Sequence, residues 1–564
     1  MNNIFYEKLS NSNPQLMREI KGRFKSAKVV LVVTGSLLIQ GLVLLSYFTK
    51  LPLPNSDNSN PYCYPIATTT RQPEPWLNRD YRSLDCLKDS SGDLLIGWHI
   101  WWSHVCYTLS AIAIVALIVG GLFLLIENIA KEQKEGTLNF IRLSPQTGYK
   151  IIIGKLLGVP LLVYIGVAAM IPLHGFAAIQ GGYFLRDFIS FYSVVSLSVL
   201  TVYLVGALYA IKGGQQALIC GVAMGGLFSS SYLPSLRLLF TQNSFVGQTS
   251  EAIWWGLSLA EKPIYFQSFV IFSLLILNSY LFKIIERAYQ KPYATPLTKK
   301  QSYSLGIVAN LYVFGFLLSS FNPTKSLISH SNSVDILSAY SILLLPVFLT
   351  LALSVSPNRQ TLQDWARYRQ TRVPETGQPR YSLRADLIWG EKSPSVVAVG
   401  IHMLMAIMTL VVAIASWDVP DEFSDSNGKL LAILGVFIVG GWLWIYSIVI
   451  QWLFLSKLSK QRWVVPLVLG AIIGLPPLVL IVLGHHTSAS FHYWLMFGFG
   501  SSPFLALNPD LLPIAVSTLL GQVLIITMSL RLFSRQLKRV GQSEFKQLMD
   551  RRAIAATSPT SASR

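Results

Sequence analysis

The chain has 564 residues, of which 52% are hydrophobic and only 13% are charged. A typical soluble domain carries about 25% charged residues, so this composition excludes a string of soluble domains. The hydrophobic residues fall in blocks of roughly 20, which is long enough for a helix to cross the ~30 Å hydrocarbon core of a bilayer. The sequence therefore predicts an all-α integral membrane protein.

About twelve such blocks follow one another along the chain, and they divide into two groups of six. None of them contains Asp, Glu, Lys or Arg. The predicted spans are residues 29–48, 104–126, 156–173, 188–210, 213–233, 266–282, 304–322, 336–355, 396–416, 430–455, 464–484 and 514–530.

The distribution of charge predicts the orientation of these spans. The net charge is +18, and 35 of the 45 Lys and Arg residues lie on the same side of the predicted membrane as the N-terminus. Lys and Arg concentrate on the cytoplasmic side of membrane proteins. We therefore expect a multi-pass protein of an inner or plasma membrane, with its N- and C-termini in the cytoplasm. The basic residues would face the anionic headgroups of the lipid bilayer, and no nucleic acid partner is expected.

The same pattern predicts how the chain is divided. The predicted segments are a cytoplasmic amphipathic interface helix (1–28), a first six-span block (29–290), a basic cytoplasmic linker (291–303), a second six-span block (304–530) and a basic cytoplasmic tail (531–564). Each block has its longest inner loop between its second and third spans, at residues 127–155 and 356–395, which suggests an internal pseudo-dimer. An outer loop, 49–95, holds Cys63 and Cys86, a possible disulfide on the oxidising side of the membrane.

The segment before the first span has the pattern of an amphipathic helix. Asn13 can cap this helix, and Pro14 suits its first position, where no backbone donor is needed. Its apolar face is predicted to consist of Leu16, Met17, Ile20 and Phe24. A basic helix with such a stripe lies flat at a membrane surface, where it serves either as an orienting anchor or as a docking surface for a cytoplasmic partner.

The inner loop 127–155 is the most informative segment. Gly136 should end the helix that emerges from the second span, and Ser144 with Pro145 should end a short helix that follows. Leu138, Ile141 and Leu143 give this short helix an apolar ridge, and a further helix then re-enters the membrane behind Lys150 and Lys155. We therefore expect a helical elbow in the cytoplasm, of a kind that can seat in a groove on another protein.

Three short motifs in this region carry a resemblance to a known family. They are Glu135–Leu138 (Glu-Gly-Thr-Leu), Leu143–Pro145 (Leu-Ser-Pro) and Gly154–Lys155 at the start of the next span. Together with the amphipathic helix before the first span, they resemble the coupling region of type-2 ABC transporter permeases, over about residues 10–290. Members of that family are six-span membrane subunits of ATP-driven exporters, and they usually form dimers with two separate ATPase subunits.

The resemblance implies a partner and a contact surface. A cytoplasmic ABC ATPase subunit would dock on the elbow. The residues implied at or near that contact are Glu132, Glu135, Gly136, Thr137, Leu138, Ile141, Ser144 and Pro145. A re-entrant segment before the sixth span, at 234–265, would also match the family. The second block departs from the pattern, because its loop 356–395 lacks Glu-Gly-Thr and offers Trp365, Arg369 and Trp389 instead. This loop is either a degenerate second coupling element or a basic surface loop.

Several kinds of site have no counterpart in the sequence. No Gly-x-x-x-x-Gly-Lys-[Ser/Thr] phosphate loop occurs, so ATP is expected on a partner subunit and no cofactor on this chain. No Cys or His spacing suggests a metal site, and no catalytic constellation suggests an enzyme. The polar side chains inside the spans, Gln40, Asn278, Gln451 and Gln522, are expected to hydrogen-bond to neighbouring helices.

The leading hypothesis is thus the permease subunit of an ABC exporter. One alternative is an ion-coupled secondary transporter or channel, which usually needs charged groups or interrupted helices within the membrane. Another is a membrane scaffold that transports nothing. The sequence leaves open the substrate, and whether one chain or a homodimer forms the pore.

Overall fold

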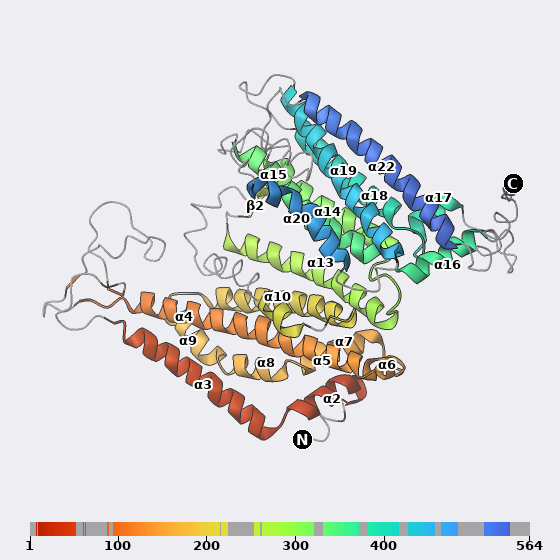
Figure 1. Ribbon diagram of the computed structural model, residues 1–564. Coiled ribbons are helices and arrows are strands. Elements are labelled where there is room, and N and C mark those ends of the chain that lie inside the picture. The colour runs from red at the N-terminus through yellow and green to blue at the C-terminus, as the bar shows by residue number, and fades with distance from the viewer. Residues whose placement is uncertain are drawn as a thin grey trace, which may run out of the picture. The chain divides into compact units, whose positions relative to one another are not determined.

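A computed structural model gives the fold of the chain. It describes residues 10–51, 94–214, 216–223, 253–259, 262–320, 331–370, 382–416, 427–456, 464–482 and 512–541, with the separate positions Glu7, Asn60, Tyr62, Cys63, Leu87 and Lys88. The contacts divide the chain into two compact units. The first comprises residues 1–252 with 258–292, and the second comprises residues 253–257 with 293–564. Figure 1 shows that both are built mainly from helices.

The first unit consists of helices, several of them interrupted. They are α2 (Pro14–Arg23), α3 (Ser26–Phe48), α4 (Trp98–Val115), the π-helix η2 (Ala116–Gly121), α5 (Leu122–Lys134), α6 (Thr137–Arg142), α7 (Gly148–Gly158), α8 (Leu161–Ala168), α9 (Ile171–Gln180), α10 (Leu185–Ile211) and α13 (Pro263–Gln290). Helix α10 lies against α5 and α13, α4 against α9, and α3 against α8. Their shared apolar core includes Leu122, Leu125 and Ile126, none of which is exposed.

Helices α4 and α5 are joined through η2 into one continuous helical rod, Trp98–Lys134. A π-helical turn displaces backbone carbonyls from their usual partners. Here the Tyr203 hydroxyl of α10 donates a hydrogen bond to the Leu117 carbonyl, at 2.7 Å. Only a glycine leaves room for this ring, because a Cβ atom at Gly121 would lie 1.6 Å from the Tyr203 hydroxyl oxygen. The bulge is therefore built into the packing of α10 on the rod.

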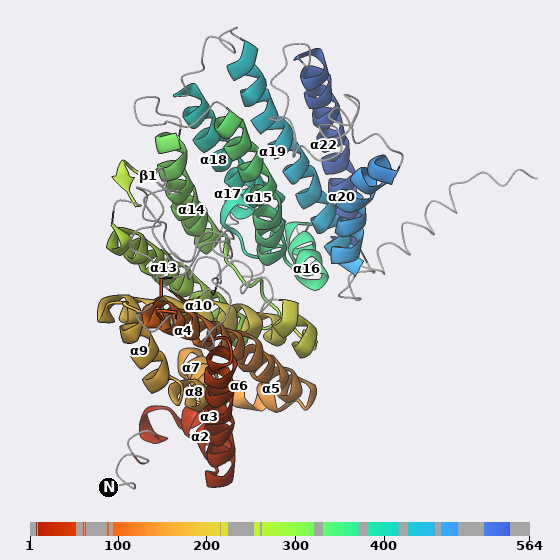
Figure 2. The ribbon, with the colours of Figure 1, turned by 90° about the vertical axis from the view of Figure 1, so that its left-hand side faces the viewer.

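The second unit has the same helical character. Its elements are β1 (Ile253–Trp254), the first residue of β2 (Leu257–Ser258), α14 (Lys299–Ser320), α15 (Ser331–Val355), α16 (Arg359–Gln370), α17 (Leu383–Trp389), α18 (Val396–Ala415), α19 (Asn427–Leu455), α20 (Val464–Val482) and α22 (Leu512–Gly541). Helix α19 lies against both α18 and α22, which is visible for α22 in Figure 2.

A short β-hairpin occupies part of the segment expected to be re-entrant. Trp255 and Gly256 turn between its two strands, with φ values of 50° and 79°, as a two-residue hairpin turn requires. The Trp254 indole donates to the Tyr312 carbonyl of α14 at 2.9 Å, and the Trp255 backbone donates to the Gly315 carbonyl at 3.1 Å. Residues 253–257 thus pack on the first helix of the second unit, while 234–252 lie outside the described residues.

Within the described residues, nine helices are long and apolar enough to cross a membrane. They are Ser26–Phe48, Trp98–Lys134, Leu161–Gln180, Leu185–Ile211, Ile264–Gln290, Lys299–Leu318, Val396–Ala415, Lys429–Leu455 and Leu512–Gly541. The chain is therefore a mostly helical, multi-pass membrane protein. Two further predicted spans, 336–355 and 464–484, fall largely in α15 and α20, and 213–233 is described only as far as residue 223. The count of twelve and the sides of the termini stay predictions.

The four polar side chains inside the spans bond to neighbouring helices, as the sequence predicts. Gln40 donates to the Ala169 carbonyl at 3.3 Å, and Asn278 donates to the Leu197 carbonyl at 3.0 Å. The corresponding pairs in the second unit are the Ser395 backbone amide donating to the Gln451 side-chain oxygen, and Gln522 donating to the Ile438 carbonyl, each at 3.0 Å. These groups hold helix pairs together.

Candidate functional site

The elbow, residues 127–155, consists of the end of α5, the six-residue helix α6 and most of α7. Gly136 separates α5 from α6 and has a left-handed φ of 75°, which strains any residue with a Cβ atom. The Thr137 hydroxyl donates to the Glu132 carbonyl at 3.2 Å, which satisfies one of the free carbonyls at the end of α5. The helix break that the sequence predicts at Gly136 is confirmed.

Helix α6 has a buried face and an exposed face. Leu138 and Ile141 point into the core of the first unit and are only 1% and 7% exposed. On the other side Phe140 is 80% exposed and Leu143 is 84% exposed. The three residues of the predicted ridge therefore do not share one face. Leu138 and Ile141 are buried and fix the helix, whereas Leu143 is exposed together with Phe140.

A network of buried charges holds the elbow to helix α2. The Glu132 carboxylate of α5 lies 2.7 Å from the Lys155 ammonium of α7 and 2.7 Å from the Arg18 guanidinium of α2. Lys155 also lies 3.6 Å from the Glu19 carboxylate, and its ammonium donates to the Asn128 side-chain oxygen at 3.1 Å. Removing one member of such a buried set leaves an uncompensated charge. The network therefore ties α2 to α5 and α7, two helices that lie more than 100 residues further along the sequence.

Two glycines of α7 allow α2 to approach. A Cβ atom at Gly154 would lie 2.8 Å from the Leu16 backbone nitrogen, and one at Gly158 would lie 2.5 Å from the Glu19 Cβ. At these distances the backbones of the two helices nearly touch, which is the use of a small-x-x-x-small pair in helix packing. The Asn13 side chain adds a hydrogen bond to the Lys150 carbonyl at 2.8 Å.

Helix α2 begins as predicted, and the protein covers its apolar stripe only in part. The Asn13 side-chain oxygen accepts from the Leu16 amide at 3.0 Å, and Pro14 is the first helical residue. Of the four residues of the apolar stripe, Met17 is buried, Leu16 and Ile20 are half-buried, and Phe24 is 50% exposed. The other buried residues of the helix are Gln15 and Glu19. Sequence reasoning missed them because the glycines of α7, rather than an apolar groove, receive α2.

The remaining residues implied at the ATPase contact differ in position. Glu132 is only 8% exposed and belongs to the buried network, whereas the Glu135 side chain is 52% exposed at the end of α5. Gly136, Thr137 and Pro145 are exposed and Ser144 is half-buried. The structure thus brings all of these residues together in the elbow, and it leaves Glu135 and Thr137 on the surface beside Phe140.

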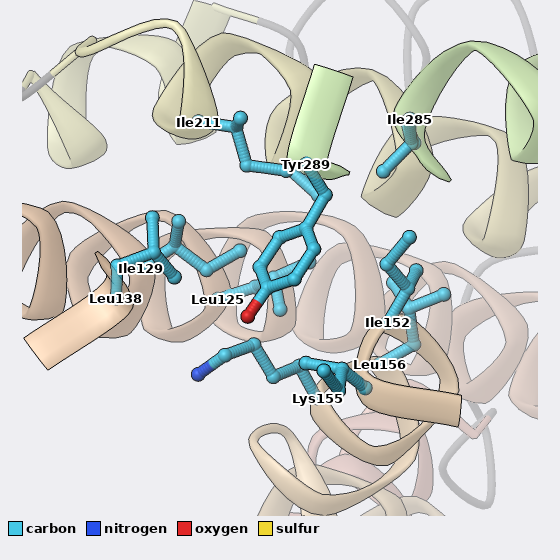
Figure 3. A pocket seen from close by; sticks show the side chains of 11 residues that line it. Leu125, Ile129, Leu138, Ile152, Lys155, Leu156, Ile211, Ile285 and Tyr289 are labelled. Atoms are coloured by element: carbon cyan, nitrogen blue, oxygen red, sulfur yellow. The ribbon is translucent and has the colours of Figure 1, made fainter. Parts of the chain in front are cut away.

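A small cavity lies inside the elbow's base. Figure 3 shows Lys155 of α7 and Tyr289 of α13 pointing toward one another there, among aliphatic side chains. Its volume of ≈ 10 Å³ is enough for about one water molecule. The Arg142 guanidinium lies over the Tyr289 ring, 5.3 Å from its centroid. The base therefore has no room for a ligand, and it links the elbow to the end of α13.

Three cations gather where the elbow meets the ends of α10 and α13. Lys212, at the end of α10, donates a hydrogen bond to the Pro292 carbonyl at 3.3 Å. Burial lowers the pKa of Lys212, and the positive charges of Arg142 and Arg287 lower it further. The elbow's base is therefore electrostatically positive on this side.

The inner loop of the second unit, residues 356–395, is organised around a different set of contacts. Lys299, only 2% exposed, donates to the carbonyls of Leu387 and Pro394 at 2.6 and 3.0 Å and to the Ser393 hydroxyl at 2.6 Å. Asp386 of α17 accepts from the Trp365 indole and from the Arg369 guanidinium of α16, each at 2.5 Å. The aromatic and basic residues that the sequence singles out here thus pack two short helices together.

Two further predictions concern a disulfide in the outer loop and the lack of a metal site. Cys63 is disulfide-bonded, and Cys106 and Cys220 are free thiols. Cys86 lies outside the described residues, so the Cys63–Cys86 pairing stays a prediction. In the part of the chain that the structure describes, no group of three His, Cys, Asp or Glu residues is placed to hold a metal ion.

No family model matches the sequence, and neither a curated protein nor a solved structure shows a significant match.

Proposed function

We propose that this chain is the membrane-spanning permease subunit of an ATP-binding-cassette exporter, and that a separate ATPase docks on helix α6. The observation that carries the proposal is the two-faced α6. One face is fixed by Leu138 and Ile141 in the core, and the other exposes Phe140 and Leu143. Large apolar side chains in such a position are what a groove on a partner protein receives.

The rigidity of the elbow supports a coupling role. A docking helix transmits force only if its base does not yield, and the buried charges of Glu19, Glu132 and Lys155, with the half-exposed Arg18, join α2, α5 and α7 into one body. Helix α5 also continues through η2 into α4, so the elbow sits at one end of a 37-residue rod, Trp98–Lys134. At 1.5 Å per residue this rod is about 55 Å long. A displacement of α6 would therefore be carried across the membrane.

The proposal divides the chemistry between two proteins. The sequence contains no phosphate-binding loop, so ATP would bind and be hydrolysed on the partner. Closure of an ATPase pair would move the elbow, and the spans would rearrange between inward-facing and outward-facing states. The residues of this chain would couple ATP hydrolysis to the movement of the spans and form the path of the substrate. The ionic network would position α6, the coupling helix.

A photo-activated cross-linker placed at Phe140 or Leu143 tests the docking surface. We expect both to cross-link, in native membranes, to a protein whose sequence contains a phosphate-binding loop. The matched control is Phe184, which is 61% exposed at the start of α10, away from the elbow. Cross-links from Phe184 alone, or from the elbow only to proteins without such a loop, would overturn the proposal. The mass of the complex gives the stoichiometry: two ATPases per chain indicate an internal pseudo-dimer, and two per pair of chains indicate a homodimer.

Two substitutions in the elbow test coupling. Glu135→Arg reverses an exposed charge, and Gly136→Leu strains the left-handed turn that orients α6. Both should abolish stimulation of the partner's ATPase activity while the chain still inserts in the membrane. Wild-type stimulation in both variants would remove the reason for assigning this role to the elbow.

A further inference from the structure

The second unit contains a wide cleft at the first turns of α14. Its volume is ≈ 980 Å³, and its walls are the start of α14 and the end of α17. The residues that matter for its chemistry are Lys300, Tyr303, Ser304, Ile307 and Trp389. None of them takes part in the elbow of the first unit, so the cleft is a separate feature.

The cleft changes from charged to apolar along α14. Lys300 lies in the first turn, and Ile307, which is 51% exposed, lies seven residues further along. A rise of 1.5 Å per residue separates the two by about 10 Å along the helix axis. Leu311, 54% exposed, continues the same stripe one turn beyond the cleft. This helix is one of the candidate membrane spans, so acyl chains of a surrounding bilayer would meet the exposed apolar residues at this end of the cleft.

The charge that the cleft offers is that of Lys300. The other acidic or basic lining residue, Asp386, is neutralised by the Arg369 guanidinium and also accepts a hydrogen bond from the Trp365 indole. Lys299 is turned inward, where three oxygen atoms accept from it. Lys300 is exposed, and within the described residues it has no hydrogen bond or ion pair. The cleft is therefore suited to an anion.

Two aromatic side chains stand at the change of polarity. Trp389 is 52% exposed, and its ring meets that of Tyr303 edge to face at 5.4 Å between centroids. The Tyr303 hydroxyl donates to the Ile388 carbonyl at 2.8 Å, which fixes α17 against α14. Such amphipathic rings favour the headgroup level of a membrane.

We propose that this cleft binds one anionic glycerophospholipid of the surrounding bilayer. The lipid phosphate pairs with Lys300, the glycerol and ester groups lie beside Trp389 and Tyr303, and an acyl chain lies along Ile307. A peptide segment of a soluble partner fits less well, because the apolar wall belongs to a membrane-spanning helix. The inference does not depend on the proposed ATPase partner.

The test measures lipid retained by the full-length protein. The purified chain is placed in nanodiscs of mixed phosphatidylglycerol and phosphatidylcholine and then analysed by native mass spectrometry. Lys300→Glu should reduce retained phosphatidylglycerol about tenfold, because it reverses the charge that the phosphate meets. The matched control, Lys392→Glu, changes an exposed lysine of the same unit that does not line the cleft, and it should retain the lipid.

A second pair of variants tests the cleft by shape. Ser304→Trp fills the cleft and should lower retention, whereas Ala309→Trp adds the same bulk at an exposed position of α14 outside it. Glycerol 3-phosphate, which has the headgroup charge without the acyl chain, should not displace the lipid. The proposal would be overturned if Lys300→Glu and Lys392→Glu retained equal amounts of phosphatidylglycerol, or if the protein retained the two lipids equally. It would also be overturned if glycerol 3-phosphate displaced the lipid, or if a peptide were found in its place.

Discussion

Each of the two inner loops is held by a buried lysine, Lys155 within the first loop and Lys299 of α14 beside the second, but the partners of the two lysines differ. Lys155 in the first unit meets the carboxylates of Glu132 and Glu19, while Lys299 in the second unit meets two carbonyls and a hydroxyl. A carboxylate loses its role when its charge is removed, whereas backbone carbonyls cannot be removed by substitution. The first loop thus depends on a few charged side chains, and the second depends on one lysine that bonds to backbone carbonyls and a hydroxyl around the end of α17.

This contrast also separates what the two loops expose. The charge network fixes α2 to α7 and leaves the apolar residues Phe140 and Leu143 free on α6. The carbonyl cluster fixes α17 to α14 and leaves a cleft with a single uncompensated charge, Lys300. An exposed ridge is suited to insertion into a partner, and a cleft is suited to receiving a ligand. The two loops therefore have different uses, although they occupy equivalent places in the chain.

The largest expected effect comes from breaking the charge network. Glu132→Gln removes the carboxylate that lies closest to Lys155 and to Arg18. Losing one member of a buried ion pair typically lowers the free energy of unfolding by ~3–5 kcal/mol. Chemical denaturation of the purified protein in detergent should show this as a lower midpoint.

Glu135→Gln is the control, since the Lys131–Glu135 pair is exposed and its atoms are 4.0 Å apart. Its loss should cost no more than ~0.5 kcal/mol. Equal midpoints for the two variants would contradict the structural role given to Glu132.

The second unit should respond less to a comparable change. Lys299→Met removes three hydrogen bonds and leaves the Leu387 and Pro394 carbonyls and the Ser393 hydroxyl without this donor. No opposite charge is stranded, so we expect a loss of ~1–3 kcal/mol, the cost of leaving a buried polar group without its partner. The same denaturation assay applies, with Lys300→Met as the exposed control. A loss larger than that of Glu132→Gln would reverse the comparison between the two loops.

Helix packing in the first unit offers a test that involves no charge. Gly158→Ala places a Cβ atom 2.5 Å from the Glu19 Cβ, so α2 must move away from α7. Overpacking of this kind costs ~1–3 kcal/mol. Gly22→Ala, on α2 itself, is the control because its Cβ would meet nothing within 4 Å. Limited proteolysis near residue 24 should be faster in Gly158→Ala than in Gly22→Ala, and identical cleavage rates would exclude this packing role.

The sequence predicts the membrane class and the local breaks well, because both depend on neighbouring residues. Blocks of apolar residues define the spans, and Gly136 and Pro14 mark helix ends by their own backbone preferences. The burial of Glu19 and Glu132 could not be predicted in this way, since it depends on a contact between segments more than 100 residues apart. The glycine pair Gly154 and Gly158 is the one sequence signal that could have predicted the close contact between α2 and α7.

The smallest expected effect concerns the positive side of the elbow. The pKa of Lys212 is lowered from its ordinary value of 10.5 by burial and then by Arg142 and Arg287, so the folded state disfavours the protonated lysine. Between the folded-state pKa and 10.5 the unfolded chain binds more protons, and stability rises with pH. Lys212→Gln should therefore raise the melting temperature at pH 6, where the penalty is present in full, and this gain should shrink as the pH approaches 10.5. Thermal unfolding of the two proteins from pH 6 to 10 checks the sign. A gain that does not change with pH would mean that the substitution acts through packing, because charge repulsion at the elbow's base is relieved only as Lys212 loses its proton.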